Sequence, residues 1–472
     1  MRLLSKHSVA MMLAAALVTP VWAQGGKTIA AAGSMKDMKS KETNDFTMPR
    51  IPVQPYKLKN GLRVVLAQDN SVPTVAVAVY YDVGSRNEKF GRTGFAHLFE
   101  HMMFQGSENV GKAMHFQYIS HAGGTMNGTT SSERTNYFEA VPSNQLPMAL
   151  WLESDRMRSL KVTQENLDNQ REAVKEEKRL RVDNQAYAPA FTRIDELVFK
   201  NPNNAHSTIG LMEDLNAATI DDVKEFFRIY YAPNNAVLVI SGDFQEKEAK
   251  ALVEKYFGTI PPQPAPASVD VAEPVEVAQR EDTIKDNFAP LAGFIMGWKV
   301  PARRTPEAYA LEYATQILFQ GDSSRLYRKL VKGEESVLQM QGGIDDRRGP
   351  SSLTLFVLPK PGQDQAKIRT TIAAEVKRLA TEGPTAAEME KVRNGIVNDG
   401  VRGMQSALFR AQRIAEYTLY DGDPNLINNE LDNYLKITPE QVKAAVAKHL
   451  DTENRVLLNI VPERKTAPKS GE

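Results

Sequence analysis

The sequence predicts an α+β fold made of two tandem homologous domains, each a mostly antiparallel sheet packed with helices. Two observations lead to this prediction. In both halves of the chain, short apolar runs typical of strands alternate with longer segments of helical periodicity. In addition, MMFQG at 102–106 recurs as ILFQG at 317–321, and a second pair of short strings, at 223–238 and 442–457, keeps the same order. Coincidence between short apolar strings is the alternative.

The first 23 residues have the three parts of a secretory signal peptide. Arg2 and Lys6 give a basic start, the apolar run Val9–Val18 is too short to span a bilayer, and Val21–Ala23 is a small-residue cleavage site. A short membrane anchor is the alternative reading. We therefore expect an exported, periplasmic protein without a stable membrane span. Residues 24–46 lack periodicity, and we expect them to be disordered.

The composition narrows the classes of function. Lys and Arg together number 58, as do Asp and Glu, so the net charge is zero and nothing points to a nucleic-acid partner. The chain contains no Cys, which excludes cysteine nucleophiles and thiolate metal ligands. A length of 472 residues, with 42% hydrophobic content, is sufficient for more than one core.

The first predicted domain spans residues 47–262 and begins with strands. Leu62–Leu66 and Thr74–Tyr81 are rich in β-branched and aromatic residues, and a proline just before the second run suits a strand entry. Asn235–Ile240 is a further apolar strand near the end of this domain. Between these strands the sequence turns to helical periodicity.

An H-x-x-E-H motif, formed by His97, Glu100 and His101, lies among apolar neighbours. Positions i, i+3 and i+4 share one helix face, so the two imidazoles and the carboxylate lie side by side. Two neutral imidazoles suit zinc, and the carboxylate can polarise a metal-bound water. A hydrogen-bonded pair of core histidines is the alternative. A metal would satisfy three ionisable groups that are otherwise costly in an apolar helix.

A charge-rich helix is predicted from Thr163 to Asp183, with its first residue as the N-cap. Its apolar stripe consists of Leu167, Val174 and Leu180. Glu177 lies three residues from two members of this stripe, whereas Glu176 is rotated off it, and Gln170 lies on the stripe too. A solvated helix explains the charged neighbours of Glu177 well but explains Glu177 poorly. Glu177 is therefore the acidic residue that faces inward and could reach a metal.

The order of these motifs resembles that of the pitrilysin, insulysin and mitochondrial processing peptidase family of inverted-motif zinc metallopeptidases, in particular its short, two-domain bacterial branch. The resemblance runs from about Tyr56 to Pro462. It is carried by NGLRVVLAQD, GFAHLFEHMMFQGS, GGTMNGTTSSERTNYFEAVP, QREAVKEEKR and IGLMEDLNAATIDDVKEFFRIYYAPNNAVLVISGDF. The family has the same α+β fold, repeated twice.

The resemblance implies one zinc ion per chain, held by His97, His101 and Glu177, with Glu100 as the general base. One position departs from the family pattern. Members often carry a second glutamate two helical turns before the third ligand, and here that position is Gln170. An amide supplies no charge, so any electrostatic role of this residue beside the ligands is weakened.

The stretch 123–130 is rich in Gly and Thr. Strands of this kind beside an active site can accept a peptide by strand addition, which demands little of the peptide sequence. By resemblance, Asn127, Gly128 and Thr129 line the edge strand that holds the substrate. An ordinary turn between strands is the alternative.

These residues together predict a zinc-dependent endopeptidase that cleaves extended peptides or unfolded protein segments by attack of a zinc-bound water, with Glu100 moving the proton. The alternative is a non-catalytic assembly or peptide-binding subunit of a protease-like complex. Such subunits usually carry a broken motif, and binding alone needs no base at position 100.

A Pro-rich linker, residues 263–278, precedes the second predicted domain, residues 279–464, and a tail follows at 465–472. The repeat register aligns the three motif residues with Glu312, Thr315 and Gln316, so we expect the second domain to have lost the metal site. We further expect a homodimer, or a heterodimer with a related chain that lacks the motif, because related full-length proteases enclose peptide substrate between four such domains.

Overall fold

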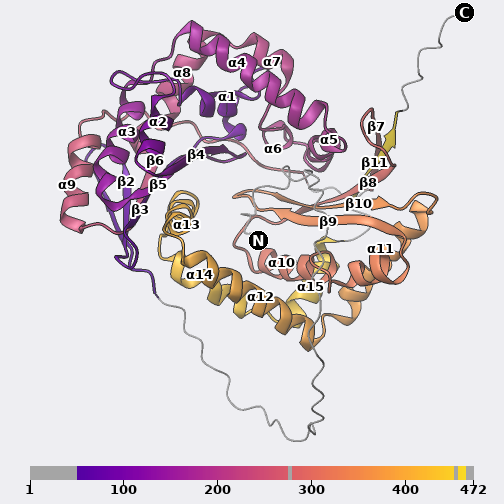
Figure 1. Ribbon diagram of the computed structural model, residues 1–472. Coiled ribbons are helices and arrows are strands. Elements are labelled where there is room, and N and C mark those ends of the chain that lie inside the picture. Colours follow the sequence, from indigo (N-terminus) through magenta and orange to yellow (C-terminus); the bar gives the residue numbers. More distant parts are fainter. Residues whose placement is uncertain (1–49, 275–278, 451–454, 464–472) are drawn as a thin grey trace, which may run out of the picture.

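The computed structural model describes residues 50–274, 279–450 and 455–463. The predicted signal peptide (1–23), the segment 24–46 and the tail (465–472) lie outside the described residues, as does the end of the predicted linker. Figure 1 shows two groups of strands and helices that face each other across the molecule.

The first sheet has six strands in the order β1-β2-β6-β3-β5-β4. They are β1 (Gln54–Lys57), β2 (Arg63–Gln68), β3 (Thr74–Tyr81), β4 (Thr125–Thr130), β5 (Thr135–Pro142) and β6 (Ala236–Gly242). Neighbours pair antiparallel except β2 and β6, which are parallel. β4 lies at one edge of this sheet.

Nine α-helices belong to the first half within the described residues. They are α1 (Phe95–Met102), α2 (Met114–His121), α3 (Leu146–Ser159), α4 (Gln164–Lys178), α5 (Ala188–Val198), α6 (Pro202–Ala205), α7 (Met212–Ala217), α8 (Ile220–Tyr230) and α9 (Glu246–Phe257). A π-helical turn, Arg179–Asp183, continues α4.

The second sheet has five strands in the order β7-β11-β8-β10-β9. They are β7 (Arg280–Asp286), β8 (Gly293–Val300), β9 (Val337–Asp345), β10 (Ser351–Pro359) and β11 (Val456–Pro462). The helices of this half are α10 (Pro306–Leu318), α11 (Gln365–Glu382), α12 (Ala386–Met404), α13 (Ala407–Tyr420), α14 (Leu426–Leu435) and α15 (Pro439–His449).

The two sheets share one topology. The strands β7, β11, β8, β10 and β9 take the places of β2, β6, β3, β5 and β4, and the parallel pair occupies the same place in each sheet. In addition, α1 follows β3 as α10 follows β8. The predicted α+β fold, with a mostly antiparallel sheet repeated in tandem, is therefore confirmed.

Each sheet buries one face under helices of its own half and the other face under a helix of the other half (Figure 1). α13, from the second half, packs its Ala411, Ile414 and Ala415 on β2, β3 and β6 of the first sheet. α5, from the first half, packs its Ile194 and Val198 on β8, β10 and β11 of the second sheet. The halves therefore exchange helices that stand at corresponding places in the chain.

Small residues allow these exchanged helices to approach closely. A Cβ atom at Gly297, on β8, would lie 2.7 Å from Val198 Cγ2 on α5. In the first sheet, Ala76 and Ala78 lie in the cluster with α13, whose own contact residues include two alanines. Close packing of this kind is sensitive to the loss or gain of a single methylene group.

Among the described residues, no helix combines the length and the hydropathy needed to cross a membrane.

The exchange predicts that the two halves unfold together. Ile414→Ala removes a buried side chain at the contact between α13 and the first sheet, and Ile194→Ala does the same at the contact between α5 and the second sheet. Each change should lower the free energy of unfolding by about 2–5 kcal/mol. Scanning calorimetry should show one transition, shifted to lower temperature in both variants.

The control is Leu435→Ala, because this α14 side chain is exposed, and such substitutions usually change stability by less than about 0.5 kcal/mol. Two separate transitions, with only one displaced in each variant, would show that the halves are independent.

Candidate metal centre

The helix that carries H-x-x-E-H starts at a position that only glycine accepts easily. Gly94 has φ +85°, and a Cβ atom there would lie 2.7 Å from the carbonyl oxygen of Ile209. Because Gly94 has no side chain, the cap comes from elsewhere. The Glu88 carboxylate accepts hydrogen bonds from the backbone N–H groups of Gly94 and Ala96, at 2.9 and 2.8 Å. These bonds satisfy backbone N–H groups that have no partner within the helix.

The face of α1 that lies opposite His97, Glu100 and His101 is buried in the core of the first half. Its five buried residues are Phe95, Ala96, Leu98, Phe99 and Met102. The Phe99 ring lies 4.3 Å, centroid to centroid, from that of Tyr231, which follows α8. This apolar anchorage sets the rotation of the helix, so that His97, Glu100 and His101 all face the other way.

α4 brings the third candidate ligand to this face. The Thr163 side chain accepts from the Asn166 N–H as the predicted N-cap, and Leu167, Gln170 and Val174 are buried. Glu177 follows at the next i+3 position. Its Oε2 lies 3.7 Å from Nε2 of His97 and 3.2 Å from Nε2 of His101.

Leu180 does not continue the apolar stripe of α4, contrary to the prediction from the sequence. Its side chain is 62% exposed. The chain changes from an α-helix to a π-helical turn at Arg179, and the wider turn alters the rotation of each following residue. Glu177 precedes this change, so its inward position follows from Gln170 and Val174 alone.

The other oxygen of Glu177 is bound by an arginine that sequence reasoning missed. Arg181 Nη1 lies 2.7 Å from Glu177 Oε1. The i, i+4 spacing from Glu177 was the available signal. With Oε1 paired in this way, Oε2 is the oxygen that faces the two imidazoles.

Two of the three candidate ligands are in the ionisation states that suit a cation. Burial, followed by the neighbouring charge of His101, lowers the pKa of His97 to about 4, so this imidazole is neutral at pH 7. Although burial alone would raise the pKa of Glu177, its hydrogen bond with His101 and the charges of His97 and Arg181 lower it to about 2. A neutral imidazole and an ionised carboxylate are the forms that bind metal.

The donor set fits zinc. His97, His101 and Glu177 offer ligand atoms that all lie within 4.8 Å of one another. Neighbouring donors around tetrahedral zinc lie about 3 to 3.5 Å apart, so the separations of 3.2 and 3.7 Å require little adjustment. Two histidines and a glutamate also leave a fourth position for water or substrate, as catalytic zinc sites do.

A second group of buried side chains, His115, Glu139 and Glu153, also brings donor atoms within 4.8 Å of one another. Here the Arg156 guanidinium already pairs with Glu153 and lies 4.2 Å from the centre of the Tyr137 ring. A resident positive charge makes this group a poor cation site. Of the two groups, the one on α1 and α4 is the candidate centre.

Glu100 is held by the neighbouring strand. The Thr130 hydroxyl, at the end of β4, donates a 2.6 Å hydrogen bond to Glu100 Oε2. Burial raises the pKa of Glu100 above its ordinary value, although this hydrogen bond and the charge of His101 oppose the rise. Thr130 was not singled out from the sequence. Strand alternation was the available signal, since residues 128 and 130 of a strand share one face.

The three residues expected to line the substrate strand lie in β4. Gly128 lies against the motif helix: a Cβ atom there would lie 3.2 Å from Glu100 Cγ. Asn127 is exposed, and its Oδ1 accepts from the Gly128 N–H. The Thr129 hydroxyl donates to Asn136 of β5, so this side chain is occupied within the sheet.

Gln170 lies beside the candidate ligand His101. It is buried on α4, and its side-chain amide donates to Asn169. Burial lowers the pKa of the His101 imidazole, but hydrogen bonds with Glu177 and Gln170 and the charge of Glu100 leave it above its ordinary value. Gln170 therefore contacts a ligand but supplies no charge to the site.

The corresponding helix of the second half, α10, carries Glu312, Thr315 and Gln316 at the aligned positions. Thr315 is buried, and its hydroxyl donates to the Leu311 carbonyl one turn earlier, as in an ordinary helix. Among the described residues, three His, Asp or Glu side chains converge in two places, and both places lie in the first half.

Sequence comparison identifies one family in both halves. A profile described as "Insulinase (Peptidase family M16)" matches residues 63–210, which include α1 and α4. A profile described as "Peptidase M16 inactive domain" matches residues 217–396. The "Zinc protease PqqE" of Helicobacter pylori is 28% identical over 76% of this chain and 82% of that protein.

Solved structures show the same fold. The chain is similar to a protease from Helicobacter pylori with a TM-score of 0.84 and 25% identity, covering 88% of this chain and all of that one. It is also similar to pitrilysin, with a TM-score of 0.72 and 16% identity. That match covers 90% of this chain but 47% of the pitrilysin chain.

The third ligand can be tested by two neighbouring substitutions. Glu177→Gln should reduce the zinc content of the folded protein sharply, because an amide replaces the ionised oxygen that faces both imidazoles. Glu176→Gln should change it little, because Glu176 points to solvent and pairs with Arg179. Metal analysis of both purified variants, with folding checked by circular dichroism, makes the comparison. Equal zinc loss in both would remove Glu177 from the site.

Proposed function

The chain belongs to the M16 peptidase family, and on this basis we propose that it is a zinc-dependent endopeptidase that cleaves extended peptides or unfolded protein segments. The observation that carries the proposal is the convergence of His97, His101 and Glu177 beside Glu100, a carboxylate that is in contact with the site but is not needed to complete it.

The proposed mechanism assigns separate tasks to separate residues. His97, His101 and Glu177 would hold the zinc. Zinc at such a site polarises a carbonyl group and makes a water molecule more acidic. Glu100 would accept the proton of the attacking water and pass it to the leaving amine, and its raised pKa makes it a stronger base than an ordinary carboxylate. Thr130 orients this carboxylate by donating to its Oε2.

The proposed substrate site is the free edge of β4. A peptide added to that edge would form backbone hydrogen bonds along Asn127, Gly128 and Thr129, with its scissile bond next to α1. Gly128 supports this arrangement because the absence of a side chain lets the strand lie against Glu100. Recognition through the backbone favours extended chains and demands little of their sequence.

The competing proposal is a subunit that binds peptides or partners without cleaving them. The match to an inactive-domain profile covers residues 217–396, whereas the motif and Glu177 lie in the region matched by the other profile. A subunit that only binds peptides or partners would not need a buried carboxylate next to the ligands, held by its own hydroxyl donor. These two points favour catalysis.

The setting of the enzyme is also a proposal. The features of residues 1–23 support export to the periplasm. The change from the first sheet to the second supports a catalytic domain at 47–262, a linker at 263–278 and a second domain at 279–464, with the qualification that α5 and α13 each pack on the sheet of the other domain.

Glu100→Gln tests the chemistry. The variant should keep its zinc and lose peptide hydrolysis by a factor of about 10² to 10⁴, because the ligands remain while the proton acceptor is gone. Cleavage of an unstructured fluorogenic peptide and metal analysis give the two readings. Removing zinc with a chelator should abolish hydrolysis by the wild-type protein, and adding zinc back should restore it. Near wild-type turnover by the variant would refute the assignment of the base.

The number of chains in the active form is a second test. The pitrilysin chain is about twice as long as the part that this protein matches, so two copies, or one copy and a partner without the motif, would supply the missing half. We expect the purified mature chain to be a dimer by light scattering. A strictly monomeric species with full peptidase activity at low concentration would show that no second chain is needed.

A further inference from the structure

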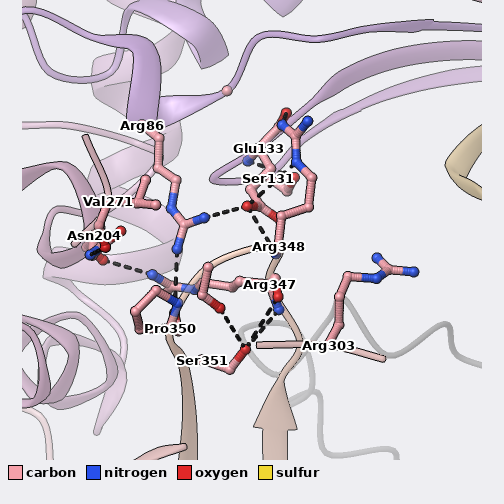
Figure 2. A network of polar contacts seen from close by, with 12 residues as sticks. Arg86, Ser131, Glu133, Asn204, Val271, Arg303, Arg347, Arg348, Pro350 and Ser351 are labelled. Atoms are coloured by element: carbon pink, nitrogen blue, oxygen red, sulfur yellow. Dashed lines mark hydrogen bonds and ion pairs between the residues drawn. The ribbon is translucent and has the colours of Figure 1, made fainter. Parts of the chain in front are cut away.

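The turn between β9 and β10, in the second half, contacts the turn between β4 and β5 in the catalytic half (Figure 2). The backbone N–H of Arg348 donates to both carboxylate oxygens of Glu133, at 3.0 and 2.8 Å. The Arg348 guanidinium donates to Asp82 at 2.6 Å and to the Glu133 carbonyl at 3.2 Å. Glu133 is therefore held by residues more than two hundred positions away.

Arg86 holds the same carboxylate from the catalytic half. Its guanidinium pairs with Glu133, and both side chains are 4% exposed. Through its other terminal nitrogen, Arg86 donates to the Pro350 carbonyl of the second half, at 3.3 Å. The side chains of Arg86 and Glu133 thus contact each other, and both contact the backbone of residues 348–350 in the other half, as Figure 2 shows.

Glu133 lies in the tight turn between β4 and β5, close to the residue that holds the Glu100 carboxylate. The Ser131 N–H donates to the Arg134 carbonyl, and Thr130 pairs with Thr135 across the ladder. Thr130 is the residue whose hydroxyl holds Glu100 Oε2. A displacement of Glu133 therefore moves the strand end from which Thr130 reaches the base.

The same turn also carries the segment that precedes α1. The N–H groups of Ser85 and Arg86 donate to the carbonyls of Ser131 and Ser132. Gly84 makes this contact possible, since a Cβ atom there would lie 2.4 Å from the Ser131 oxygen. The segment ends at Glu88, which caps the helix of the candidate ligands.

Because these contacts are charged and partly buried, their role is more than holding the two halves together. Burial lowers the pKa of the Arg86 guanidinium, and the charge of Glu133 opposes this effect. The nearby charges of Arg347 and Arg348 lower the pKa further, so bringing these cations together costs free energy. Replacing a buried ion pair by apolar residues is often neutral or stabilising. What an ion pair supplies, and an apolar contact does not, is a defined direction for each group.

We propose that Arg348 of the second half is a positioning residue for catalysis, which acts through Glu133 and Thr130 to orient the Glu100 carboxylate. This inference rests on the proposed function and gives the half without a metal site a part in the reaction. It assigns no contact between Arg348 and substrate or metal.

A double-mutant cycle tests this proposal. Arg348→Ala and Thr130→Val should each lower kcat by about ten-fold to a hundred-fold, because a small displacement of a catalytic group has effects of this size. KM and zinc content should stay near wild type. The double variant should be no slower than the slower single variant, since both changes act on the orientation of the same Glu100 carboxylate. Arg348→Lys should recover part of the lost kcat.

Arg193→Ala is the matched control. Arg193 is 41% exposed, compared with 32% for Arg348, and it also makes a 2.6 Å ion pair, from α5 to Asp282 of β7. It has no contact with the β4–β5 turn and should leave kcat unchanged. Hydrogen exchange gives a reading that does not depend on turnover: amides in residues 125–135 should exchange faster in Arg348→Ala but not in Arg193→Ala.

The outcomes separate this inference from the function on which it rests. Unchanged kcat in Arg348→Ala, additive losses in the double variant, or a loss explained by missing zinc would each overturn the positioning role. A wild-type protein that binds zinc and hydrolyses no peptide would overturn the proposed endopeptidase activity itself, and the role of Arg348 with it.

Discussion

The exchange of helices between the halves is the constraint on which the rest of the structure depends. A sheet of five or six strands that packs helices on one face only would leave a wide apolar surface in water, and burial of such surface is the main favourable contribution to folding. Here α13 covers the first sheet and α5 covers the second. Because each half completes the core of the other, their relative position is set by close packing, and polar contacts between the halves can then be precise.

The candidate centre uses that rigidity. α1 is only eight residues long and makes few hydrogen bonds of its own, so its geometry comes from its surroundings. Five apolar side chains fix its rotation, Glu88 fixes its first turn, and Gly128 lets β4 lie beside Glu100. α4 then brings Glu177 to the two imidazoles. Each of the side chains at the centre is thus placed by contacts with at least one other element.

Patterns within a single helix or strand predicted much of this arrangement, but they could not predict contacts between residues far apart in the chain. The i, i+3, i+4 spacing placed His97, Glu100 and His101 on one face, and the period of α4 selected Glu177 over Glu176, because helix geometry is set by residues close in sequence. The strand Thr74–Tyr81 was also predictable for this reason. Leu180 was misjudged because a π-helical turn leaves no clear sequence signal. The contacts of Glu133 with Arg348, and the exchange of α5 and α13, join residues far apart in the chain, and no pattern within either segment indicates its partner.

The helix exchange also relates the two halves to each other by symmetry. The exchanged helices occupy equivalent places in two halves of equal topology, which is the arrangement that two copies of a single half would adopt around a twofold axis. A lone half would expose one face of its sheet, so neither half is a complete folding unit without the helix of the other. The second half is therefore required by the first sheet, through α13, whether or not it carries a metal site of its own.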